Sequence, residues 1–304
     1  MSPQATSLQQ RIASDNRILI AEVSPPQGAD PGPLRQTAKR YAGKVHALGI
    51  SDNRDRVSMS ALAAASLVAG EGIEPILHVT TRDRNRIALV SEALGAQALG
   101  IRNLLCTSGT HQTLGAFRAA KNVYDVDSVQ LLRTYATLAS DGAAVGEPGG
   151  FAGAGPFCLG AVAAPDADPL ELQIARLVKK TRAGARFLIT QPVFDWERFR
   201  AWWDEVTRRG LHEKVAILAG VQLLADGHLA DVQAGRRPVP RIPEAVLQRV
   251  ASKSGPAAQR AEAVAVALET IRRLCELDGL RGFSIAIDGD APLEVLEKSG
   301  LGSA

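Results

Sequence analysis

The side chains that could do chemistry in this 304-residue chain are polar residues that close short apolar runs. Glu22 closes the run ILIAE and is soon followed by Pro25 and Pro26. A carboxylate that points inward from such a rigid strand end is partly desolvated, which raises its pKa and suits it to donate a proton near neutral pH. We therefore predict Glu22 as a general acid. The alternative is a structural carboxylate held in a salt bridge.

Two further polar residues interrupt or close apolar runs. His78 lies within ILHVTT, where an isolated histidine is more often a hydrogen-bonded core residue than a catalyst. Gln191 lies between an apolar run and Pro192, where a neutral amide could bond the donor and acceptor edge of a heterocycle. The remaining polar residues at run ends are Ser51, Ser108, Thr110 and Asp288.

Two other groups of conspicuous residues have simpler interpretations. Asp83, Arg84 and Arg86 begin a segment with helical spacing, so we expect a solvated ion-pair face at a helix N-terminus. Trp202 and Trp203 lie in another helical segment, where packing is the expected role.

Short apolar runs alternate along the chain with segments of helical spacing. The runs, each short enough for a buried strand, are 18–24, 45–51, 75–81, 103–109, 157–163, 187–193, 215–221 and 283–288. The helical segments are 58–72, 84–100, 127–142, 169–184 and 195–210, and several end in a glycine suited to a helix C-cap. Strands that alternate with helices form a parallel sheet covered by those helices.

The number of such units predicts a closed (β/α)₈ TIM barrel, with an open doubly wound sheet as the alternative. No GxGxxG or GxxxxGK[ST] glycine pattern follows any run, which favours the barrel. Glycine and proline mark 146–156 and 234–243 as loops. We expect one catalytic domain over 1–304, with 1–17 as an N-terminal extension. Its active site would lie at the carboxyl ends of the strands.

Composition narrows the function classes. The 35 basic and 32 acidic side chains are interspersed and give a net charge of +3, so we expect neither a nucleic-acid partner nor a membrane surface. Cys106, Cys158 and Cys275 are widely spaced, which argues against a disulfide framework or a structural zinc site. We expect no metal. No signal peptide or membrane-spanning run is evident, and a cytoplasmic location fits best.

Six segments, in order along the chain, together resemble the methylenetetrahydrofolate reductase family. They are AEVSPPQG (21–28), ILHVTTRDRNR (76–86), ALGAQALGIRNLLCTSG (93–109), NVYDVDSVQLL (122–132), KKTRAGARFLITQPVFD (179–195) and AILAGVQLL (216–224). The resemblance implies a (β/α)₈ barrel that holds FAD and belongs to one-carbon and methionine metabolism. It implies transfer of a hydride from NADH or NADPH, through the flavin, to 5,10-methylenetetrahydrofolate, giving 5-methyltetrahydrofolate.

The resemblance also assigns roles to individual residues. Glu22 matches the general acid that opens the folate's imidazolidine ring, Gln191 matches the glutamine that bonds the pterin, and Lys180 matches a lysine at the cofactor's phosphates. The positions implied to bind the cofactor are Ser51, His78, Ser108, Gly109, Thr110, Tyr124, Asp125 and Lys180. Thr110 is also implied to contact the substrate.

The chain departs from the family pattern at Thr110. The family's fourth-strand motif usually ends in Gly-Asp, with the aspartate close to flavin and folate, whereas this chain has Gly109-Thr110. Loss of a carboxylate there should favour the reduced, anionic flavin and could weaken contact with a cationic folate intermediate. His111 could partly substitute for the missing aspartate.

The leading hypothesis is therefore a flavin-dependent methylenetetrahydrofolate reductase, with a homo-oligomer expected from the resemblance. The runner-up is a flavin-free, folate-binding methyltransferase or accessory subunit on the same barrel, suggested by Thr110. A third hypothesis is a subunit that receives electrons from an electron-transfer protein instead of a pyridine nucleotide. The sequence leaves open the choice between NADH and NADPH.

Overall fold

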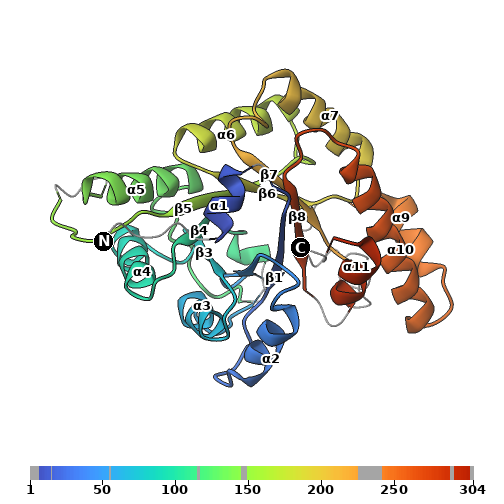
Figure 1. Cartoon of the computed structure of the whole chain (residues 1–304), viewed down its shortest axis with the longest axis horizontal. Coiled ribbons are helices and arrows are strands. Elements are labelled where there is room, and N and C mark those ends of the chain that lie inside the picture. Colours follow the sequence, from blue (N-terminus) through green and yellow to red (C-terminus); the bar gives the residue numbers. More distant parts are fainter. Residues whose placement is uncertain are drawn as a thin grey trace.

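Eight parallel strands close into a barrel in a computed structural model that describes residues 7–14, 16–54, 56–114, 117–144, 149–224, 242–287 and 291–301. The strands follow one another in chain order, and β1 pairs with β8 to close the sheet (Figure 1). The strands are β1 (Ile18–Val23), β2 (Ala47–Ile50), β3 (Pro75–Thr80), β4 (Asn103–Thr107), β5 (Cys158–Ala163), β6 (Phe187–Pro192), β7 (Ala216–Val221) and β8 (Gly282–Ala286).

Helices surround the barrel and connect successive strands (Figure 1). They are α1 (Ser7–Ala13), α2 (Gly32–Tyr41), α3 (Ala61–Gly70), α4 (Arg86–Ala98), α5 (Ser128–Asp141), α6 (Leu170–Arg182), α7 (Trp196–Arg208), α9 (Glu244–Ala251), α10 (Pro256–Cys275) and α11 (Ala291–Ser299), with a short 3₁₀ helix η1 (Gln112–Leu114). The predicted (β/α)₈ barrel is confirmed, and the open-sheet alternative is wrong because β1 and β8 are hydrogen-bonded neighbours. Asp288 and most of the expected loop 234–243 lie outside the described residues.

Two layers of apolar side chains stabilise the barrel. The larger lies between the strands and their helices, and it buries Trp202 and Trp203 as the sequence predicted. The smaller lies inside the barrel around Phe187, toward the amino ends of the strands, which we call the lower half of the barrel. The ring of Phe187 fills the space beside Gly160, where a Cβ would lie 2.2 Å from the ring. The lower barrel is thus filled with side chains, and the open space is at the carboxyl ends of the strands.

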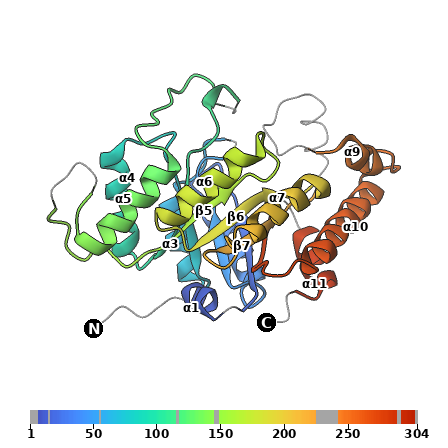
Figure 2. The same cartoon turned by 90° about the horizontal axis from the view of Figure 1, so that it is seen from above.

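Helix α1 covers the lower end of the barrel, opposite the β4–α5 segment (Figure 2). Its Leu8 is fully buried against the inner core, and the Glu74 carboxylate accepts hydrogen bonds from the Leu8 amide and, at 2.5 Å, from Ser7 Oγ. Part of the expected 1–17 extension is therefore packed into the barrel. None of the described helices combines the length and apolarity that crossing a bilayer requires.

We predict that Leu8→Ala lowers the free energy of unfolding by about 2–5 kcal/mol, because it leaves a cavity in the inner core. Ile87→Ala is the control, since Ile87 is 80% exposed and its loss should cost less than about 0.5 kcal/mol. Urea denaturation measures both variants. Equal losses would show that α1 does not close the barrel.

Candidate functional site

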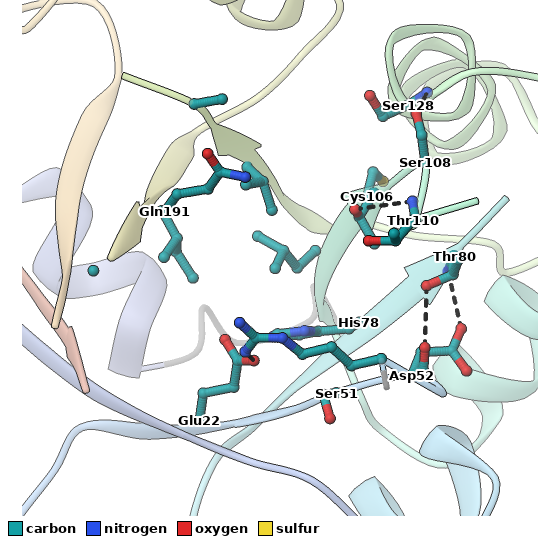
Figure 3. Close-up of a pocket in the computed structure, with 18 of the residues that line it drawn as sticks. Glu22, Ser51, Asp52, His78, Thr80, Cys106, Ser108, Thr110, Ser128 and Gln191 are labelled. Carbon is teal, nitrogen blue, oxygen red and sulfur yellow. Dashed lines mark hydrogen bonds and ion pairs between the residues drawn. The ribbon is translucent and has the colours of Figure 1, made fainter. Parts of the chain in front are cut away.

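A cavity of about 1070 Å³ opens at the carboxyl ends of the strands; seven of the eight strands contribute to its lining, and after β2 the lining residues are Ser51 and Asp52, which directly follow that strand. This is the end at which TIM barrels place their active sites. Of the positions predicted from the sequence, the cavity lining includes Glu22, Ser51, His78, Ser108, Gly109, Thr110, Lys180 and Gln191. Figure 3 shows Glu22, His78 and Gln191 pointing into the same space, with Thr110 on another wall.

Glu22 forms an ion pair with Arg54, which comes from the loop between β2 and α3. Arg54 Nη1 lies 2.9 Å from Glu22 Oε1, and the Glu22 side chain is 17% exposed. Burial raises the pKa of Glu22, but the charges of Arg54 and His78 and the hydrogen bond from Arg54 together bring the pKa below its usual value. The expectation of a raised pKa is therefore wrong for this state of the protein, because the sequence did not reveal the paired arginine.

His78 is buried beside Glu22, and the absence of a side chain at Gly49 on β2 leaves room for its ring. Burial lowers the pKa of His78, so its neutral form is favoured. Within the described parts of the chain, the buried Nε2 of His78 has no hydrogen-bond partner. Since buried polar atoms are usually paired, His78 has bonding capacity available beside the cavity.

Asp52 ties the end of β2 to the end of β3. Its buried carboxylate accepts a hydrogen bond from the Thr80 amide at 2.9 Å and from Arg84 at 2.5 and 3.2 Å. Arg84 was expected on a solvated helix face, but its side chain is only 17% exposed. That expectation is wrong for Arg84, since its partner is a buried carboxylate on another strand end. Arg86 does form an exposed pair, with Asp125.

Arg82, which follows β3, holds together the loops that follow β2 and β4. Its guanidinium donates to the carbonyl oxygens of Asn53, at 2.8 Å, and Thr110, at 3.2 Å, and it forms a two-bond pair with Asp83. Arg82 is buried at 4% exposure. A single cation therefore fixes the loops after β2 and β4, both of which reach the cavity.

The segment after β4, residues 108–110, forms part of the cavity wall. Gly109 has a φ of +77°, and a Cβ there would lie 2.5 Å from Thr80 Cγ2, so glycine is needed for both conformation and space. Ser108 Oγ accepts a hydrogen bond from the Ser128 amide at the start of α5. Tyr124 Oη donates to the Gly109 carbonyl at 3.3 Å. Tyr124 and Asp125 themselves are not among the described residues that line the cavity.

Gln191 owes its direction to a bulge between β6 and β7. The register shifts between Ile189 and Pro192, and a β-bulge of this kind re-aims a side chain. Gly220 on β7 permits β6 and β7 to approach closely at the bulge, because a Cβ at Gly220 would lie 2.4 Å from the Thr190 carbonyl oxygen. The Gln191 amide consequently extends into the cavity (Figure 3).

Cations gather on the α6 side of the cavity. Lys180 Nζ donates to the Val162 carbonyl at 2.5 Å, and burial together with the nearby Arg176 lowers the pKa of Lys180 to about 8. Arg176 and Lys179 also line the cavity. The N-terminus of α5 is less available to an anion, since Asp127 already accepts hydrogen bonds from the Val129 and Gln130 amides. An anionic ligand would therefore find its charge partners on α6.

Sequence reasoning missed Arg54, Asp52 and Arg82 as parts of the site. Asp52 and Arg54 lie one and three residues after Ser51, the end of the apolar run 45–51. Inspection of three more residues beyond that run would have included both. Their partners could not be read from the sequence, because Glu22 and Arg84 are 32 residues away from Arg54 and Asp52, respectively.

The sequence of this chain matches known proteins. The family model described as methylenetetrahydrofolate reductase matches residues 7–292. A Caenorhabditis elegans protein described as a probable methylenetetrahydrofolate reductase (NADPH) is 28% identical over 174 residues, which is 54% of this chain. The match covers 23% of the nematode protein, so this chain spans about a quarter of that relative's length.

Solved structures share the fold at low sequence identity. An uncharacterised protein from Clostridium thermocellum that binds two copies of 5-methyl-5,6,7,8-tetrahydrofolic acid superimposes with a TM-score of 0.65, at 13% identity over 97% of both chains. An F420-dependent secondary alcohol dehydrogenase, in complex with an F420-acetone adduct, has a TM-score of 0.56 at 11% identity, covering 95% of this chain and all of the other. At these identities the likeness establishes the barrel fold alone.

We predict that Asp52→Asn lowers the free energy of unfolding by about 3 kcal/mol, because it leaves the largely buried guanidinium of Arg84 with only the more distant carboxylate of Glu92, 3.8 Å away, as counter-charge. Asp125→Asn is the matched control, since it removes the carboxylate from an exposed arginine pair and should cost less than about 1 kcal/mol. Denaturant titration compares the two variants. A loss for Asp52→Asn no larger than the control would contradict the role of this pair.

Proposed function

Because the chain belongs to the methylenetetrahydrofolate reductase family, we propose that it reduces 5,10-methylenetetrahydrofolate to 5-methyltetrahydrofolate in one-carbon metabolism. FAD is the proposed cofactor, and NADH or NADPH is the proposed hydride donor. The observation that carries the proposal is the convergence of Glu22, His78 and Gln191 on one cavity at the active-site end of the barrel. The folate bound by the Clostridium neighbour and the F420 held by the dehydrogenase support a folate substrate and a flavin-like cofactor on this fold.

The described residues fit a flavin in three respects. His78 has an unpaired buried Nε2 beside the cavity, Gly109 allows the backbone to approach a flat ring, and Lys180 with Arg176 supplies positive charge for a pyrophosphate. These residues would hold FAD. When bound, it would carry the hydride from the nicotinamide to the folate.

The protein's own groups would bind and protonate the folate. The Gln191 amide both donates and accepts hydrogen bonds, as the edge of a pterin requires. Glu22, once protonated, would give its proton to the imidazolidine nitrogen whose bond to the bridging carbon breaks. Burial disfavours the charged form of His78, which limits the positive charge that His78 adds near the folate.

A flavin-free, folate-binding methyltransferase or accessory subunit is the second candidate, favoured by Thr110. That residue places a hydroxyl where the family pattern has an aspartate, and the nearby carboxylates of Asp52 and Asp83 are already paired with arginines. A titration with FAD separates the candidates, because the second predicts folate binding without flavin affinity.

We predict that Glu22→Gln keeps reduction of the flavin by the nicotinamide but lowers folate reduction by about 100-fold or more, since it removes the proton donor. The two half-reactions are followed separately by stopped-flow absorbance of the FAD-loaded protein. Glu71→Gln, a glutamate outside the cavity whose partners are Arg35 and Lys39, is the control. Equal folate reduction in wild type and Glu22→Gln would show that the acid is another group.

We also predict that Thr110→Asp lowers the reduction potential of the bound flavin, because a carboxylate beside the ring disfavours the anionic reduced form. Reduction against a dye of known potential measures the change, with Thr110→Asn as the uncharged control. An unchanged potential in Thr110→Asp would place this loop away from the ring.

A further inference from the structure

Arg54 lines the cavity but has no role in the reaction described above. Its guanidinium extends into the cavity from the loop between β2 and α3 and pairs with Glu22, the proposed proton donor. The Arg54 side chain is 40% exposed, so it reaches from the cavity mouth to a nearly enclosed carboxylate. A carboxylate in such a pair is held in its ionised form and has no proton to give.

The loop directs Arg54 into the cavity through its neighbour Asn53. Asn53 has a φ of +46°, a conformation that asparagine tolerates better than most residues. Its Oδ1 accepts a hydrogen bond from the Ser58 amide at 3.0 Å, and its carbonyl accepts one from Arg82 at 2.8 Å. The backbone from which Arg54 extends is thus fixed at two points, so any displacement of the guanidinium comes from rotation about the bonds of its side chain.

Two ionisable groups act on the Glu22 carboxyl among the described residues: Arg54 from the β2–α3 loop and His78 from β3. Ala286 of β8, which pairs with Glu22 across the strands, does not ionise, and neither do the described cavity-lining residues of β6, β7 and β8. Since burial favours the neutral form of His78, Arg54 supplies the lasting positive charge. The charge state of Glu22 therefore depends on where this guanidinium lies.

We propose that Arg54 is a positioning residue that keeps Glu22 ionised in the ligand-free enzyme and is displaced when folate enters. Displacement breaks the ion pair, and the carboxylate then takes up one proton from solvent, which it later gives to the folate nitrogen. The guanidinium stays charged and turns to the half-exposed mouth, where water solvates it. The inference rests on the proposed function of Glu22. It adds that Glu22 carries the proton it donates only in the folate complex.

Proton uptake on folate binding tests the coupling. Calorimetric titration of the FAD-supplemented protein with 5-methyltetrahydrofolate, in two buffers of different ionisation enthalpy at weakly acidic pH, counts the protons bound. Wild type should take up about one proton for each folate, and Glu22→Gln should take up none. Arg54→Met should take up clearly less than wild type, because its Glu22 is already partly protonated, and Arg54→Lys should restore uptake.

The matched control is Arg56→Met, which removes a cation from the same loop. Arg56 bonds Gln27 at 3.1 Å and makes no contact with Glu22, so its variant should behave like wild type. Equal uptake in wild type and Glu22→Gln, or in wild type and Arg54→Met, would overturn the proposal.

A titration without ligand separates this inference from the proposed function. The infrared carboxyl band of Glu22 reports the pH at which Glu22 is half protonated. The band is obtained by subtracting the spectrum of the same protein carrying Glu22→Gln, for wild type, Arg54→Met and Arg56→Met in turn. Arg54→Met should raise that midpoint by about one pH unit or more, a tenfold change in the equilibrium, whereas Arg56→Met should not. An unchanged midpoint in Arg54→Met would refute the role of Arg54 whether or not the protein turns over folate. Failure to bind folate would instead refute the proposed function, and the coupling with it.

Discussion

The buried pair of Asp52 and Arg84 is the interaction on which the site depends. Asp52 also accepts the Thr80 amide, so one carboxylate fixes the ends of β2 and β3 relative to each other. Arg82 extends the same arrangement to β4 by holding the Thr110 carbonyl. A charge pair of this kind is costly to bury and more costly to break, which gives the loops one preferred arrangement. The cavity keeps its shape because these three strand ends are tied together.

The charges of the cavity are divided between its two sides. On one side, Glu22 is balanced by Arg54 and lies beside His78, whose neutral form burial favours. On the other, Lys180 and Arg176 present positive charge from α6. This division suits a ligand with an anionic part toward α6 and a reacting heterocycle toward Glu22. A folate and a flavin, as proposed, would meet these two environments.

Much of the fold was predictable, because it depends on local patterns. Apolar runs and helical spacing alternate with a period that only a parallel, helix-covered sheet accommodates, and the strands were predicted to within a few residues. Strand ends such as Glu22, His78 and Gln191 were predicted to share one edge, since the carboxyl ends of parallel strands meet there. The structure brings all three to the cavity.

What escaped prediction depends on contacts between distant segments. Arg84 has the same local charge pattern as Arg86, yet one pairs with a buried aspartate and the other with an exposed one. Asp125 accepts a hydrogen bond from the Arg86 amide, 39 residues away along the chain. The bulge that directs Gln191 and the arginine that lowers the pKa of Glu22 likewise arise only when strands pair.

The reoxidation of reduced flavin by the folate substrate tests the central claim most directly. The FAD-loaded protein would be reduced by light without a nicotinamide, mixed anaerobically with 5,10-methylenetetrahydrofolate, and followed by visible absorbance and product analysis. The account predicts that the oxidised flavin spectrum returns as 5-methyltetrahydrofolate forms in equal amount. A flavin that stays reduced while folate is bound would contradict it.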